Sequence, residues 1–264
     1  MAVLRDHALL LRRFPYGESS VVAHVFTRQH GQVHLLAKGA YRPTSRYFAV
    51  LDFFDTLDLE LDRSPRRELD LLRAGALVTR RQHVATRLAT YDAALAVLEL
   101  IDLVSRPGQP ESWLFDAGER ALCELERESR VPDFVRVVFA LSVLQNLGLA
   151  PAVERCAACG REPGTSARDR TRAVFSASAG GRLCARCGDE VRRSGRRVGT
   201  LPCEVLLDAA ALLRDDPLPL APERLAQLRD FVERFMEYHL ETRPKSHRRR
   251  LVATAAPSRK ASSA

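Results

Sequence analysis

Apolar and polar residues alternate with a period of two over the first 80 residues, which is the pattern of β-strands. This alternation predicts strands over residues 2–14, 20–28, 32–37, 47–61 and 68–72. Between the second and third strands, His30-Gly31 is a turn signal, so residues 20–37 form a candidate hairpin. Five short strands without an intervening helix indicate a small barrel or sandwich.

The period changes to that of helices from about residue 84 onward. Apolar residues then recur at three- and four-residue steps, as one face of a helix requires, at Leu88, Tyr91, Leu95, Leu98, Ile101 and Val104. Further helices are expected over about 111–128, 133–147, 202–213 and 222–241. The chain therefore reads as an α+β protein, in which a β domain precedes a helical domain that is interrupted by a cysteine-rich segment.

These patterns divide the chain into five parts. We expect a β-barrel domain over residues 1–80, a helical domain in two parts over 81–150 and 199–241, and a four-cysteine module over 151–198. Residues 242–264 contain seven basic and no acidic side chains among Ser, Ala and Pro, and we expect this tail to be disordered.

The chain has 264 residues, 41 basic and 33 acidic, and a formal net charge of +8. Only three of the basic residues are Lys, and an Arg- and Ala-rich composition is also typical of a GC-rich genome, so the total alone is weak evidence for a nucleic-acid ligand. Its distribution is more informative. The net charge is +3 over residues 1–80, −3 over 81–150, +6 over 151–200 and +2 over 201–264.

No apolar run approaches the ~20 residues that a membrane-spanning helix needs. Charged residues also interrupt the N-terminal apolar stretch, which argues against a signal peptide. We therefore expect a soluble, cytoplasmic protein.

The clearest chemical motif is a pair of Cys-x-x-Cys knuckles, formed by Cys156 with Cys159 and by Cys184 with Cys187. Two such knuckles can place four thiolates around one tetrahedral zinc ion. A glycine follows each knuckle and is expected to let the backbone curl under the sulfur, and a hairpin ending at Gly180-Gly181 can fill the spacer. Two disulfides or a thioredoxin-type redox site are the alternatives.

Four thiolates close the coordination shell, whereas a catalytic zinc keeps an open position. We therefore expect one structural ion. Cys123 and Cys203 lie in helical patterns with apolar neighbours and are expected to be core residues rather than ligands.

Two groups of short segments together form a recognisable pattern. The N-terminal group comprises Gly17-Glu18-Ser19-Ser20, Phe26-Thr27, Gly31 and the run from Ala37 to Ser45. The later group comprises Phe175, Gly180-Gly181 and the second knuckle. In this order and spacing, the segments resemble the RecO family of bacterial recombination mediators, and the resemblance extends over about residues 1–240.

The resemblance implies an N-terminal OB-fold barrel, a helical domain and an inserted zinc module. It also implies binding of single- and double-stranded DNA, annealing of complementary strands, and interaction with RecR and sometimes RecF. Contact with the C-terminal tail of single-stranded-DNA-binding protein is a further family trait, and such a protein would act at the nucleoid. Together these activities help to load recombinase onto gapped DNA.

The loop after the third strand has the residue types that contact phosphates. By matching the family pattern, the candidate DNA-binding residues here are Lys38, Arg42, Ser45 and Arg46. A merely solvated loop is the alternative. Four arginines beside the second knuckle are further candidates, with a plain charged surface as the alternative; these are Arg192, Arg193, Arg196 and Arg197.

The sequence contains no phosphate-binding loop, nucleophile elbow or paired-carboxylate arrangement, so we expect a protein that is not an enzyme. An RNA-binding OB/zinc protein of the translation machinery remains an alternative, because the same chemistry suits either nucleic acid. A zinc hydrolase or nuclease is the enzymatic alternative.

Overall fold

The computed structural model describes residues 2–240 except 43–44, 46, 48–49, 65, 163–170 and 217–218. Its N-terminal part is a closed, OB-like barrel with the strand order β1-β2-β3-β5-β4. The strands are β1 (Ala2–Tyr16), β2 (Ser20–Thr27), β3 (Gly31–Ala37), β4 (Thr56–Arg63) and β5 (Asp70–Thr79). Only the short contact between β3 and β5 is parallel among these described strands. The predicted barrel and its hairpin are confirmed.

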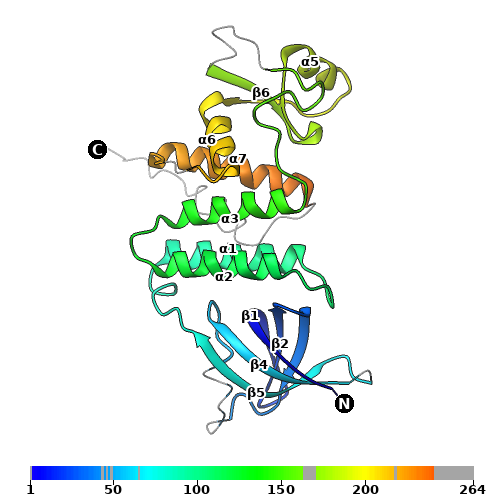
Figure 1. Ribbon diagram of the computed structural model, residues 1–264, viewed down its shortest axis with the longest axis vertical. Helices are drawn as coiled ribbons and strands as arrows, with labels where there is room; N and C mark the ends of the chain where they lie inside the picture. The colour runs from blue at the N-terminus through cyan, green and yellow to red at the C-terminus, as the bar shows by residue number, and fades with distance from the viewer. Residues whose placement is uncertain are drawn as a thin grey trace, which may run out of the picture.

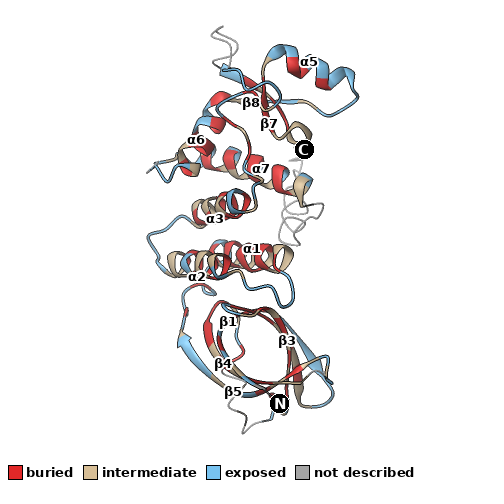
Figure 2. Ribbon diagram, turned by 45° about the vertical axis from the view of Figure 1, so that its right-hand side comes forward, coloured by how far each residue is buried: buried red, intermediate tan, exposed pale blue. Residues whose placement is uncertain are grey.

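The barrel interior follows directly from the period-two pattern. In β2 and β3 the odd-numbered apolar residues, among them Val21, Ala23, Val33 and Leu35, are buried in the barrel core. The even-numbered residues are half-buried, except Phe26, which is buried in the helical core instead. Burial of such side chains stabilises the fold by roughly 25 cal/mol per Å² of apolar surface. Figure 2 shows the strands as a ring with buried positions along its wall.

The prediction of a strand over residues 47–61 is wrong in its first half, because β4 begins only at Thr56. Val50 and Leu51 instead belong to the barrel core. The backbone turns at Phe54, where φ is 73°. The apolar residues that resembled a strand are thus buried in a turning segment.

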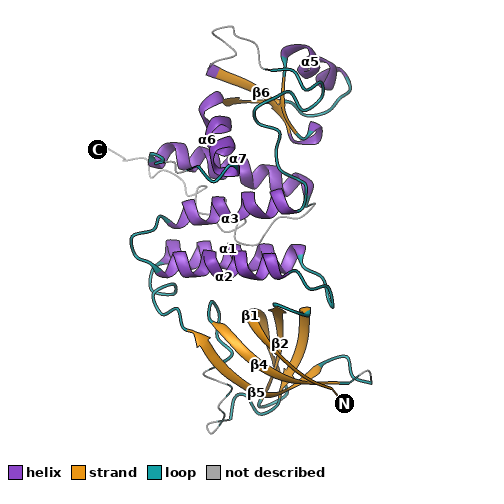
Figure 3. Ribbon diagram, in the orientation of Figure 1, coloured by secondary structure: helices purple, strands orange, loops and turns teal. Residues whose placement is uncertain are grey.

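Five helices form the middle of the molecule, close to their predicted bounds. They are α1 (Leu88–Val104), α2 (Ser112–Glu126), α3 (Pro132–Asn146), α6 (Cys203–Leu213) and α7 (Pro222–His239). Figures 1 and 3 show them stacked on the barrel, first α1 and α2, then α3, then α7 with α6. Their apolar faces share one core, in which Ile101, Leu144 and Leu228 are fully buried.

The barrel is attached to the helices by packing and by ion pairs. Phe26 of β2 packs on Phe115 of α2, with ring centroids 6.3 Å apart, and both are buried. Arg28 donates to Asp116 at 2.9 and 3.0 Å beside this contact. At the linker, the buried Arg81 donates to Phe54 O at 2.7 Å and to Thr56 Oγ1 at 3.0 Å.

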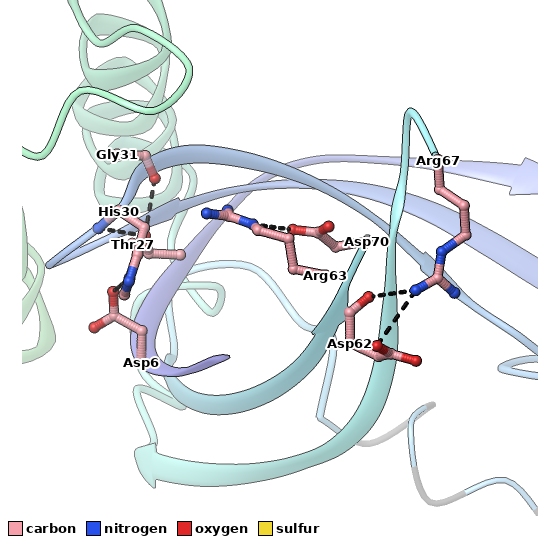
Figure 4. A network of polar contacts seen from close by, with 8 residues as sticks. All are labelled: Asp6, Thr27, His30, Gly31, Asp62, Arg63, Arg67 and Asp70. Carbon is pink, nitrogen blue, oxygen red and sulfur yellow. Dashed lines mark hydrogen bonds and ion pairs between the residues drawn. The ribbon is translucent and has the colours of Figure 1, made fainter. Parts of the chain in front are cut away.

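Short-range polar contacts fix the turns of the barrel (Figure 4). At the turn between β2 and β3, Thr27 Oγ1 donates to Gly31 O at 3.0 Å, and Asp6 lies 2.8 Å from the His30 ring nitrogen. Near the start of β5, Arg63 donates to Asp70 at 3.1 Å. These contacts fix the start of β3, the end of β4 and the start of β5.

The cysteine-rich segment forms a small unit at the other end of the molecule (Figure 1). A three-stranded sheet of order β7-β6-β8 is built from β6 (Arg172–Ser176), β7 (Gly181–Leu183) and β8 (Gly199–Pro202). A one-turn helix, η1 (Ala177–Ala179), connects β6 to β7, and α5 (Ala185–Arg193) follows β7. The hairpin expected in the spacer is therefore β6–β7.

Among the described residues, no helix is both long and apolar enough to cross a bilayer. The basic tail expected over residues 242–264 lies outside the described residues. The division into domains stays a prediction.

Candidate nucleic-acid interface and metal centre

The loop that follows β3 is fastened to the barrel through its backbone. Tyr41 N–H donates to Ser19 O at 2.8 Å, and Arg42 N–H donates to Gly39 O at 3.1 Å. Farther along, the Tyr47 hydroxyl donates to Arg73 O of β5 at 2.6 Å. The described part of the loop is thus held in one conformation by bonds to two neighbouring segments.

Two predicted DNA-binding residues of this loop present free cations. Lys38 and Arg42 are exposed, and neither forms an ion pair with any residue that the structure describes. Gly39 has a φ of 67°, and the side chain of Arg42 lies across it: a Cβ at Gly39 would stand 3.2 Å from Arg42 Cδ. The turn therefore favours glycine, and Arg42 uses the space that a side chain would fill.

The other two predicted loop residues differ from these. Ser45 is half-buried, and its Oγ accepts the Tyr47 N–H at 3.2 Å, so this hydroxyl stabilises the loop. Arg46 lies outside the described residues.

Elsewhere in the barrel, many arginines are neutralised by carboxylates. Arg5 pairs with Asp58 at 2.5 Å, and this hydrogen bond raises the pKa of Arg5 and lowers that of Asp58. Arg12 pairs with Asp102 of α1, and Arg63 with Asp70. Lys38 and Arg42 therefore differ from these three arginines, because their positive charge is not neutralised by a carboxylate among the described residues.

The second predicted group of basic residues lies at the far end of the molecule. Arg192 and Arg193 are in the last turn of α5, Arg196 and Arg197 follow it, and all four are exposed. Arg192 is paired with Asp189 at 2.8 Å. Figure 1 places α5 and the barrel at opposite ends, so the structure does not bring the two predicted groups together.

The four predicted metal ligands do come together. The Sγ atoms of Cys156, Cys159, Cys184 and Cys187 all lie within 4.8 Å of one another, and those of Cys159 and Cys184 are 3.9 Å apart. Tetrahedral zinc with bonds of ~2.3 Å places its sulfurs about 3.8 Å apart. The cluster therefore fits a tetrahedral ion of this size.

The electrostatics of the cluster also favour a cation. Burial acts to raise the pKa of Cys156, but hydrogen bonds from the backbone of Cys184, Cys159 and Ala158 outweigh it and lower the pKa to about 6. A hydrogen bond with Cys184, burial and the neighbouring sulfurs raise the pKa of Cys187 to about 12. Four such close sulfurs cannot all ionise unless a positive ion offsets their repulsion.

The two glycines that follow the knuckles have different roles. Gly160 has a φ of 70°, and its N–H donates to Cys156 O at 2.8 Å, as expected for a knuckle turn. Gly188 lies inside α5 and is needed for packing instead, because a Cβ there would stand 2.9 Å from Val174 Cγ1. The Gly188 N–H also donates to Cys184 O at 2.9 Å, so the backbone turns after both knuckles, but a positive φ favours glycine only at Gly160.

The remaining cysteines lie outside the cluster. Cys203 is buried in the helical core, and Cys123 is half-buried, with its sulfur 3.0 Å from Arg81 Nη2.

Comparison with known proteins identifies the family. The model described as Recombination protein O N terminal matches residues 1–81, and the one described as Recombination protein O C terminal matches residues 85–248. The chain belongs to the RecO family. Within that family it is 30% identical to the DNA repair protein RecO of Myxococcus xanthus over 91% of this chain and 94% of the relative. It is 31% identical to that of Nocardioides sp. over 92% and 96% of the two chains.

The match to the RecO family spans both the barrel and the helices. The resemblance seen in the sequence is thereby confirmed. Sequence reasoning did not single out Phe14 and Tyr16, which the structure leaves exposed on β1 beside the candidate loop. Phe14 is the last residue of the strand predicted over residues 2–14 and resembles a core residue, whereas Tyr16 lies just beyond that strand.

Proposed function

We propose that this RecO-family protein is a DNA-binding recombination mediator that anneals complementary single strands. With RecR, and in some settings RecF, it would help to load recombinase onto gapped DNA coated by single-stranded-DNA-binding protein. The observation that supports this proposal best is that Lys38 and Arg42 are exposed cations with no ion pair to a described residue, on a hydrogen-bonded loop of an OB-like barrel.

The proposed mechanism is electrostatic. Two DNA strands repel each other through their phosphates, and a protein that neutralises part of this charge lowers the barrier to their encounter. Lys38 and Arg42 would bind phosphates of one strand. The hydrogen bonds of Tyr41 and Tyr47 would hold the backbone of the loop in place before DNA binds. Annealing breaks no covalent bond, so this mechanism requires no catalytic residue.

The four cysteines are proposed to hold one structural zinc ion. The donor set of four sulfurs favours zinc, and closed four-coordinate sites of this kind stabilise folds rather than catalyse reactions. The arginines beside it, Arg192, Arg193, Arg196 and Arg197, would give a second, separate surface for DNA. Contact with the tail of single-stranded-DNA-binding protein and with RecR completes the proposal, and its place of action is the nucleoid.

Competition between nucleic acids tests the proposed ligand. In this assay, labelled single-stranded DNA is first bound to the full chain, and unlabelled DNA or RNA of the same sequence is then added as competitor. The proposal predicts that DNA competes at least as well as RNA. A marked preference for RNA would contradict the DNA assignment and support a role with RNA instead.

A further inference from the structure

The outer face of β1, β2 and β3 carries aromatic side chains that the electrostatic argument does not use, and those on β1 are exposed. We call Phe14, Tyr16, His24 and His34 the aromatic strip. Phe14 is 46% exposed and Tyr16 is 58% exposed, two positions apart on the same face of β1. On β2, Val22 lies opposite Phe14 and Ser20 opposite Tyr16, while His24 lies opposite Arg12.

The rings of the strip already contact one another. His24 of β2 stacks on His34 of β3, with centroids 3.9 Å apart and planes at 20°. The ring of Phe14 meets His24 edge-on, with centroids 5.5 Å apart. This packing holds His24 and His34 in place and leaves much of Phe14 open to solvent, as its exposed fraction shows.

Phe14 and Tyr16 are exposed because β1 extends beyond β4, the strand that pairs with it on the side opposite β2. β4 pairs only with residues 2–9 of β1, whereas β2 pairs as far as Tyr16. On the segment beyond β4, the neighbouring Arg13 bonds to Leu51 O at 2.7 Å and lies over the ring of Phe53. Residues 51–53 thus contact Arg13, while Phe14 and Tyr16 stay exposed to solvent.

The two ends of the aromatic strip differ in the charge beside them. At one end, Asp102 neutralises Arg12 and also accepts a hydrogen bond from Gln32 at 3.2 Å. At the other end, Ser20 stands opposite Tyr16 and its Oγ accepts the Gly39 N–H at 3.3 Å. Lys38 comes directly before Gly39, so the free cations lie at the Tyr16 end.

Exposed aromatic rings next to free cations match the chemistry of one strand of unpaired nucleic acid. Bases stack on aromatic faces whatever their sequence, while phosphates bind the cations. We infer that the aromatic strip stacks the bases of single-stranded DNA whose phosphates lie on Lys38 and Arg42. The inference rests on the proposed function, and it adds a binding contribution that a duplex, whose bases are already stacked, does not receive.

Binding of an abasic strand separates stacking from charge. The full chain and the double variant Phe14→Ala with Tyr16→Ala are titrated with oligothymidylate and with an abasic phosphodiester strand of the same length. Stacking is worth roughly 1–3 kcal/mol per base, so we expect the variant to lose about tenfold or more in affinity for oligothymidylate. Its affinity for the abasic strand and its salt dependence should change by less than about twofold.

Two further variants test whether a loss of affinity in the double variant comes from lost stacking or from a disturbed fold. Tyr238→Ala removes a similarly exposed tyrosine, 53% exposed, from α7 and should leave both affinities unchanged. Phe14→Trp enlarges the stacking surface and should retain or raise the affinity for oligothymidylate. An equal loss for both strands, or no loss for oligothymidylate, overturns the inference. Failure of the unmodified chain to bind either strand contradicts the proposed function itself.

Discussion

Gly31 joins the barrel to the helices at a point where no side chain fits. Its φ is 68°, and a Cβ there would stand 2.3 Å from Gln109 O. The adjacent Gln32 N–H donates to Arg106 O at 3.2 Å, so the β2–β3 turn and the α1–α2 loop are in backbone contact. The absence of a side chain at one position thus allows two parts of the protein to dock.

Gly31→Ala should therefore destabilise the protein by more than the backbone strain of placing alanine at a positive φ. Gly17 is the matched control, since its φ is 59° and a Cβ there meets nothing within 4 Å. Gly17→Ala should cost only the backbone strain of about 1–2 kcal/mol, and Gly31→Ala clearly more, as measured by urea unfolding. Equal costs would show that the docking contact adds nothing.

His24 should make the stability depend on pH. Burial, followed by the nearby His34, lowers its pKa from 6.5, and Arg12 acts in the same direction while Asp102 opposes it. The unfolded chain therefore binds the proton more readily, so stability is full above about pH 6.5 and falls as pH drops through the lowered value. Urea midpoints across this range should fall more steeply with acid for the native chain than for His24→Phe. Identical slopes would exclude His24 as a contributor.

The four-cysteine unit has too small a separate core to be stable without the proposed zinc ion. Its separate buried cluster consists of Cys156, Leu183, Cys187 and Val191, and two of these four are proposed metal ligands. Most of its stability must then come from metal binding, which reaches ~10–16 kcal/mol in zinc-finger peptides.

Chelation or Cys156→Ser should therefore unfold β7 and α5 while the barrel stays folded. β6 should be affected less, because Ala173 and Phe175 attach it to the helical core. Amide hydrogen exchange would show fast exchange confined to the module, and metal analysis should find one zinc per chain in the unmodified protein. Cys123→Ser, outside the cluster, should keep its zinc. Zinc content well below one per chain would contradict the four-thiolate site.

The loop after β3 should dominate the salt dependence of DNA binding. Each lost phosphate contact lowers the slope of log affinity against log salt by about 0.7 for single strands. Lys38→Ala and Arg42→Ala should each flatten the slope by up to this amount. Arg63→Ala, which removes a cation already paired with Asp70, should leave the slope unchanged. An unchanged slope in both loop variants would remove the loop from the interface.

Much of the architecture could be predicted from the sequence because the signals were local. The periods of two and of about 3.6 placed the β2–β3 hairpin and the five long helices, and the knuckle spacing placed four sulfurs together. Phe14 resembled a core residue at the end of the predicted strand, but in the structure β1 extends to Tyr16, beyond its pairing with β4, and both aromatic side chains are exposed. Likewise, the sequence around Gly188 did not show that this glycine is needed for a close contact between α5 and Val174.

At the scale of the whole molecule, the two basic surfaces lie at opposite ends of a stack of helices (Figure 1). A strand bound on the barrel loop would leave Arg193 and Arg197 free to meet other DNA. We expect the effects of substitutions at the two ends on binding to add, because distant sites with no shared partner are energetically independent. Titrations of single and combined variants check this, and strong non-additivity would contradict it.

The central claim is that cations on the barrel loop promote pairing of complementary DNA. The most direct test measures annealing of complementary oligonucleotides coated with single-stranded-DNA-binding protein. We predict that the full chain accelerates annealing, that Lys38→Ala with Arg42→Ala loses most of the acceleration, and that Arg63→Ala retains it. Absence of acceleration by the full chain, or equal acceleration by the loop variant, would contradict the claim.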